Sequence, residues 1–224
     1  MATSGITSFN ITIDEAIEEA YERCGIRTNS GQDIRSARRS LNLLFSEWGN
    51  RGINLWKVKS ETTTLVNGTA TYNTPSDCND VLEAVVTTTG GTQQTLTKIS
   101  RSEYIAIPNK TDTGTPSQYY VNRQITPTIS LYLAPDTSAV TNIFYYYLAR
   151  IQDAGAYTNT TDMPFRFYPC MVSGLAFYLS QKHAPERIQA MKLLYEDELK
   201  RALDEDGQRT SVYITPNVYY PQGS

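Results

Sequence analysis

The spacing of apolar residues changes twice along this chain of 224 residues, and this change is the strongest constraint on its fold. Up to about residue 52, and again after Asp162, apolar residues recur every three or four positions, which is the period of an amphipathic helix. Between Leu55 and Arg150 they alternate with polar residues, as in half-buried strands. The sequence therefore predicts helices at both ends of the chain and a β-rich segment between them.

Two helices are predicted in the first 52 residues. Thr12 and Glu15 have the spacing of a capping box, which satisfies free amides at a helix N-terminus. The first helix is expected to stop at Gly25, and the second near Gly49 and Gly52. The buried stripes are predicted to be Ile13, Ala16, Ile17, Ala20 and Cys24 in the first helix, and Ile34, Ala37, Leu41, Leu44, Phe45 and Trp48 in the second.

The central segment contains clear turn signals. Asn67-Gly68 lies between Thr-rich runs and predicts a hairpin with a type I′ turn, which requires positive φ at both central residues. Gly90-Gly91 predicts a second hairpin. Ser100 and Glu103 predict the capping box of one short helix. Several short strands separated by such turns favour a small sandwich or barrel.

Two more helices are predicted near the C-terminus. Pro169 marks the first turn of one helix, and Pro185 opens the next, because a proline at the first helical position loses no hydrogen bond. Gly207 ends this last helix. Residues 208–224 show no hydrophobic period and are expected to form an extended arm.

The helices at the two ends are expected to pack together, because neither pair can bury its apolar stripe alone. The predicted fold is therefore α+β: an antiparallel four-helix bundle of two N-terminal and two C-terminal helices, with an inserted β-rich sandwich or barrel module and an extended C-terminal arm. The predicted domains are a helical bundle of residues 1–52 and 160–207, an inserted β domain of residues 53–159, and an arm of residues 208–224.

The composition argues against several classes of function. A net charge of −3 does not suit a protein that binds nucleic acid by neutralising phosphates. The N-terminal sequence lacks the regions of a secretory signal, and no apolar run approaches the ~20 residues of a membrane helix. We therefore expect synthesis in a cytoplasm and no membrane association. Cys24, Cys78 and Cys170 are expected to be reduced, buried thiols.

Nothing in the sequence singles out a catalytic or cofactor site. His183 is the only histidine, so the chain lacks the usual ligands of a zinc site. No glycine-rich phosphate loop is present. The acidic runs 196–198 and 204–206 are expected on a solvated helix face. We therefore expect no enzymatic activity, no cofactor and no metal; a small hydrolase that uses a carboxylate pair is an alternative.

Charged and aromatic residues indicate contact surfaces instead. Arg35, Arg38 and Arg39 are predicted to meet Glu15 and Glu19 of a neighbouring copy, and ion pairs between the same two helices within one chain are an equal alternative. The chain has 16 tyrosines, a residue type that is enriched in interfaces. The arm residues predicted to bind a partner are Tyr213, Ile214, Tyr219 and Tyr220.

Several segments together resemble the head-to-tail adaptor proteins of short-tailed bacteriophages, also called tail tube A proteins or portal accessory factors. In chain order these segments are residues 37–48 followed by Gly52, residues 99–110 and 116–123, residues 163–165, residues 174–179 and residues 184–186. The resemblance covers nearly the whole chain in order, and it rests on packing patterns rather than on a catalytic signature.

The resemblance implies a homododecameric ring in the virion. Such a ring lies beneath the portal protein, joins it to the next tail component (a nozzle or tail hub) and continues the DNA channel. Double-stranded DNA is expected to pass through an acidic lumen without specific binding. The arm is expected to order on the portal. The alternative is an aromatic-rich binding module of a phage tail or surface protein, which recognises carbohydrate or protein through the β segment.

Overall fold

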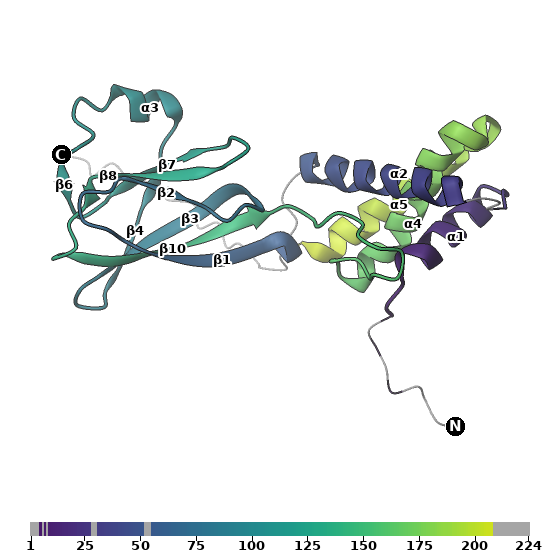
Figure 1. Ribbon diagram of the computed structural model, residues 1–224, viewed down its shortest axis with the longest axis horizontal. Coiled ribbons are helices and arrows are strands. Elements are labelled where there is room, and N and C mark those ends of the chain that lie inside the picture. Colours follow the sequence, from purple (N-terminus) through teal and green to yellow (C-terminus); the bar gives the residue numbers. More distant parts are fainter. Residues whose placement is uncertain (1–4, 6, 8, 28–30, 52–54, 208–224) are drawn as a thin grey trace, which may run out of the picture.

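The computed structural model describes residues 5, 7, 9–27, 31–51 and 55–207. Figure 1 shows an elongated molecule with most of its helices at one end and its strands at the other. The helices are α1 (Ile13–Arg23), α2 (Gly31–Asn50), α3 (Arg101–Ala106), α4 (Tyr168–His183) and α5 (Ile188–Asp206). Short 3-10 turns span Leu55–Lys57, Phe165–Phe167 and Pro185–Arg187. The predicted mixture of helices and strands is confirmed.

The helical region is organised around α4, which packs against α1, α2 and α5. Gly174 permits this central position, because a Cβ atom there would lie 2.8 Å from Leu44 Cδ2 and 2.9 Å from Tyr195 Cε2. An antiparallel four-helix bundle is therefore not supported. The described chain has five helices and a large β region, α3 lies among the strands, and α4 is a central helix rather than one of four equivalent ones.

The strands are β1 (Val58–Thr64), β2 (Thr71–Asn73), β3 (Cys78–Thr88), β4 (Gln93–Thr95), β5 (Thr97–Lys98), β6 (Thr113–Gly114), β7 (Gln118–Asn122), β8 (Thr128–Tyr132), β9 (Ala134–Pro135) and β10 (Val140–Ala149). One sheet has the order β1-β10-β3-β4 and is antiparallel throughout. The second has the order β2-β8-β7-β5, in which only β5 and β7 are parallel, and β6 and β9 form a small parallel pair.

The two four-stranded sheets enclose one hydrophobic core, which is separate from the core of the helices. Its fully buried side chains include Tyr119 and Ile129 from one sheet and Ile143 and Tyr145 from the other. The Tyr119 hydroxyl donates a hydrogen bond to the Leu82 carbonyl at 3.0 Å and so links β7 to β3 across the core. The β region is therefore a sandwich, one of the two predicted forms.

One of the two predicted hairpins is wrong. Gly90-Gly91 does connect the antiparallel strands β3 and β4, with φ +83° at Gly91. In contrast, Asn67-Gly68 connects β1 in one sheet to β2 in the other. Gly68 has φ +72°, but Asn67 does not have positive φ, so the turn is not type I′. Long-range pairing of β1 with β10 and of β2 with β8 replaces the local pairing that the turn signal suggests.

The predicted helix ends are mostly confirmed. The Thr12 backbone N–H and hydroxyl both donate to Glu15 Oε2 at 2.8 Å. Ser100 and Glu103 form a reciprocal capping box at α3. α2 ends at Asn50, one residue after Gly49, and Gly52 lies outside the described residues. Pro185 opens a 3-10 turn, and α5 begins only at Ile188.

The β region begins and ends at neighbouring strands. β1 pairs with β10 in antiparallel register, with Val58 opposite Leu148. β1 follows α2 and the turn at Leu55–Lys57, whereas β10 leads back towards α4. The chain therefore leaves the helical region and returns to it side by side (Figure 1).

Candidate interaction surfaces

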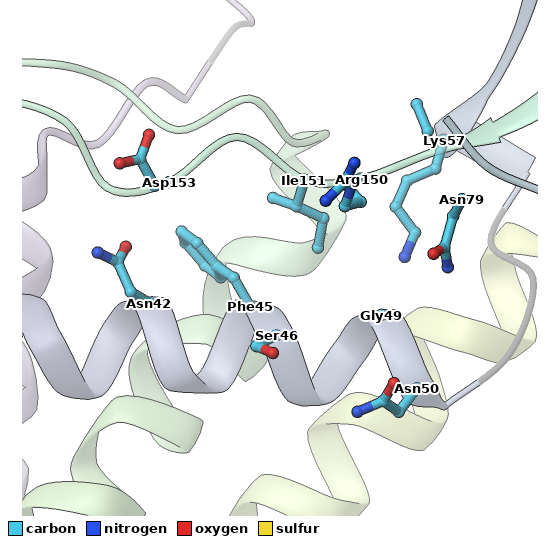
Figure 2. Close-up of a pocket in the computed structure, with 11 residues that line it drawn as sticks. Asn42, Phe45, Ser46, Gly49, Asn50, Lys57, Asn79, Arg150, Ile151 and Asp153 are labelled. Atoms are coloured by element: carbon cyan, nitrogen blue, oxygen red, sulfur yellow. The ribbon is translucent and has the colours of Figure 1, made fainter. Parts of the chain in front are cut away.

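A polar pocket of about 310 Å³ lies where the β region meets α2 (Figure 2). Figure 2 shows that α2 forms one side of this pocket, while the start of the β region and the chain after β10 form the other. Its lining residues are Asn42, Phe45, Ser46, Gly49, Asn50, Lys57, Asn79, Ala149, Arg150, Ile151 and Asp153. Amide and cationic groups of this kind can hold a carboxylate, but they do not form a nucleophile–base pair.

Lys57 and Asp206 place charge inside the molecule near this junction. Lys57 is 3% exposed, and burial lowers the pKa of its amine, while the negative charge of Asp206 acts in the opposite direction. Asp206 is the last residue of α5 and forms an ion pair with Arg166. The expectation that residues 204–206 lie on a solvated face is therefore wrong for Asp206, whose side chain is 3% exposed. Cations that are close in space but distant in sequence, such as Arg166 and Lys57, can make burial of a carboxylate favourable, and no local sequence pattern reveals them.

The solvent-facing side of α1 is acidic. Its exposed side chains are all carboxylates: Asp14, Glu15, Glu18, Glu19 and Glu22. Glu15 accepts hydrogen bonds from Thr12, first from the backbone amide, and these lower the pKa of its carboxyl group. Glu19 forms an ion pair with Arg23 at 2.9 Å. Both predicted interface carboxylates are thus exposed on one helix face.

The three arginines at the start of α2 have different environments. Arg35 and Arg39 are exposed, whereas Arg38 is half-buried. Arg38 Nη1 donates to the Gly155 carbonyl at 3.3 Å, and its guanidinium lies 5.6 Å from the centre of the Tyr157 ring. Arg38 therefore holds the segment that follows β10. Within the described part of the chain, none of the three arginines forms an ion pair, so the within-chain pairing with α1 is not observed.

An apolar groove of about 730 Å³ runs beside the acidic face of α1. It is lined by Phe9, Ile11, Glu15, Glu19, Arg23, Phe165, Tyr168, Pro169 and Val172. Phe9 is 68% exposed and Phe165 is 55% exposed, and their ring centres lie 5.7 Å apart. The sequence alone does not reveal this groove, because Phe9 and Phe165 are far apart in the chain and belong to no periodic stripe.

Half of the aromatic run Phe144–Tyr147 in β10 belongs to the sandwich core. Tyr145 and Tyr147 are buried, while Tyr146 is 45% exposed and meets Phe144 edge-to-face at 5.2 Å. At α3 a second small aromatic group is present, in which Tyr104 stacks on a β7 tyrosine at 5.2 Å. The β region therefore offers only limited aromatic surface to a ligand.

The candidate catalytic and metal-binding residues, the histidine and the three cysteines, do not lie together in one site. His183 is exposed at the end of α4, and its ring centre lies 6.0 Å from that of Tyr21. The three cysteines are free and buried, as predicted, and burial raises the pKa of the Cys170 thiol to about 12. The described residues contain no cluster of potential metal ligands, and none of their helices has the length and apolar character of a membrane span. The predicted arm residues Tyr213, Ile214, Tyr219 and Tyr220 lie outside the described residues.

Comparison with known proteins adds one finding. Residues 12–218 match the family model described as SU10 adaptor protein. The match includes α1, the whole β region and α5. No curated protein matches the sequence.

Proposed function

Because the chain belongs to the SU10 adaptor protein family of phage head-to-tail adaptors, we propose that it forms a dodecameric ring between the portal protein and the next tail component, a nozzle or tail hub. A member of this family is a structural component of the virion. In this proposal the ring continues the DNA channel, and double-stranded DNA passes through it without specific binding. The net charge of −3 supports passage without retention, since phosphates are not attracted.

The observation that carries this proposal is the presence of two separate hydrophobic cores at opposite ends of an elongated chain. A protein that joins two partners needs two docking surfaces that do not interfere with each other. We assign residues 1–52 and 160–207 to a helical domain that forms the wall of the ring. Residues 53–159 form a β domain that offers a second docking surface to the tail component.

The C-terminal arm, residues 208–224, is assigned to portal binding. Ordering an extended segment costs about 1–2 kcal/mol per residue. Burial of Tyr213, Ile214, Tyr219 and Tyr220 on the portal would offset this cost, because aromatic rings bury a large area per residue. In this assignment the protein works by assembly rather than by catalysis.

A carbohydrate- or protein-recognising module is the alternative function. Family membership favours the adaptor, and the burial of Tyr145 and Tyr147 removes much of the aromatic surface that the alternative needs. Specific retention of the chain on a glycan array would favour the alternative.

Electron microscopy of the tagged full-length chain, produced together with its phage portal, tests the adaptor proposal. We expect a twelve-fold ring stacked on the portal ring. A chain that stays monomeric in the presence of assembled portal would contradict the proposal. A matched variant that ends at Gly207 should keep the circular dichroism spectrum of the full chain but lose portal binding; normal binding by this variant would contradict the role of the arm.

A further inference from the structure

Glu15 and Glu19 line the groove beside α1, whereas Arg35 and Arg39 line a separate hollow on α2. Figure 1 shows α2 along one edge of the helical region and α1 at another. We propose that the groove beside α1 binds the outer face of α2 from a second copy of this chain, with the two helices antiparallel. This proposal rests on the proposed ring and specifies the contact between neighbours within it.

The charged residues on the two faces have matching spacings. Glu15 and Glu19 are four residues apart on α1, and Arg35 and Arg39 are four residues apart on α2. Four residues correspond to ~6 Å along a helix axis. Two helices that pack side by side can therefore align both acidic residues with both arginines. Among the described residues neither arginine has an ion-pair partner within its own chain, so both are available for this contact.

The residues that flank the two charged pairs decide between the antiparallel and the parallel helix orientation. Leu43 follows Arg39 by four residues and is 58% exposed. On the other surface, the groove is lined by Ile11, which lies just before α1 on the Glu15 side, and by Arg23, which follows Glu19 by four residues. Antiparallel packing places Leu43 opposite Ile11. Parallel packing would place the leucine opposite the charged Arg23 and is therefore less favourable.

In the antiparallel orientation the contact has the composition of a specific interface. The leucine enters a groove formed by Phe9, Ile11 and Phe165, and the two charge pairs border it. An apolar centre with a charged rim is the usual arrangement in protein–protein interfaces. The two surfaces differ from each other, so each copy uses one surface for each neighbour. Such head-to-tail contacts close into rings when the rotation between copies permits it.

Disulfide cross-linking of full-length chains tests the contact. Leu43→Cys and Phe165→Cys would be made as separate variants, because the three native cysteines are buried and do not compete. Under mild oxidation we expect covalent dimers when the two variants are mixed, but not from either alone. A chain with both substitutions should give a ladder of covalent multimers. As a control, Leu193→Cys, which lies on α5 and is 71% exposed, should not cross-link to Phe165→Cys.

The cross-linking is carried out both on the concentrated free chain and on the chain assembled on its portal. Portal-bound rings without the cross-link would overturn this contact while leaving the adaptor proposal intact. A cross-link in the free chain without any portal binding would support the contact and contradict the adaptor proposal. A cross-link that forms only after removal of residues 208–224 would mean that the groove binds the arm, and it would overturn the proposal.

Exchange of charges tests the helix orientation. Arg35→Glu alone should weaken self-association at least about tenfold, which corresponds to about 1.4 kcal/mol. Adding Glu19→Arg to the same chain should restore it, because these two positions meet in the antiparallel contact. Restoration by Glu15→Arg instead would show the parallel orientation and overturn the proposed one.

Discussion

The indole N–H of Trp48 in α2 donates a hydrogen bond to the Tyr195 hydroxyl in α5 at 2.8 Å. Both side chains are almost fully buried, at 2% and 1% exposure. The Tyr195 hydroxyl in turn lies 3.5 Å from Glu47 Oε2. A polar link therefore crosses the apolar core of the helical region and fixes α2 relative to α5.

We expect Tyr195→Phe to lower the free energy of unfolding by about 1–3 kcal/mol, because the buried Trp48 N–H would lose its acceptor. Tyr178→Phe is a matched control. The Tyr178 hydroxyl also donates to Glu47, at 3.1 Å, but this residue is only half-buried, and its loss leaves no buried donor unpaired. Urea denaturation followed by tryptophan fluorescence measures both variants, and equal effects would contradict the explanation.

Gly174→Ala is expected to destabilise the helical region by about 1–3 kcal/mol, because the added methyl group would overlap the buried side chains of Leu44 and Tyr195. Gly49→Ala in α2 is the matched control, since nothing lies within 4 Å of the added atom. There the change should stabilise the protein by up to about 1 kcal/mol through helix propensity. Thermal unfolding of the two variants should shift in opposite directions.

Asp206→Asn is expected to cost about 2–3 kcal/mol of stability, because it leaves Arg166 and Lys57 without the carboxylate near them. The loss should be below that of a fully buried pair, since the Arg166 side chain is 30% exposed. Asp204→Asn, at an exposed position of the same helix, should change stability by less than about 0.5 kcal/mol. Comparable losses in chemical denaturation of the two variants would argue against a buried charge network.

The sandwich should lose stability at alkaline pH. Burial, with a smaller effect of Asp80, raises the pKa of Tyr119 to about 12, and burial together with Asp77 raises that of Tyr147 to about 12. In the unfolded chain these hydroxyls lose their protons near pH 10. The stabilising contribution is therefore complete below about pH 10 and falls as the pH rises to about 12, by at most about 1.4 kcal/mol per pH unit for each group.

Tyr119→Phe isolates one of these groups. At pH 8 we expect it to cost about 1 kcal/mol, because the hydrogen bond to the Leu82 carbonyl is lost. Between pH 10 and 12 its unfolding free energy should fall less steeply than that of the unaltered chain. Urea denaturation at a series of pH values measures both effects, and parallel pH curves would contradict the assignment.

The sequence predicts well those features that depend on local patterns. The stripe from Ala37 to Trp48 and the capping box at Thr12 define α1 and α2 because helix periodicity and caps act within a few residues. Prediction from the sequence fails where pairing between distant segments replaces the pairing that a local pattern suggests. Asn67-Gly68 has an ideal hairpin composition, but β1 pairs instead with the long strand β10, which lies nearly 80 residues further on.

The candidate surfaces were predictable only in part. The acidic face of α1 and the exposed Arg35 and Arg39 follow from helix geometry, since charged residues occupy the face opposite the apolar stripe. The position of Arg38 over Tyr157 does not, because it depends on how the chain folds back after β10. The groove between Phe9 and Phe165 likewise exists only once α1 and α4 have packed.

The pairing of Val58 with Leu148 has a consequence for how proteins of this kind can change. The two backbone positions at which the β region begins and ends are separated by one strand spacing, ~5 Å. Its size can therefore increase or decrease without altering the gap that the helical region must span. The 90 or so residues between these positions can thus be remodelled, while the helices that support them keep the same spacing at the two attachment points.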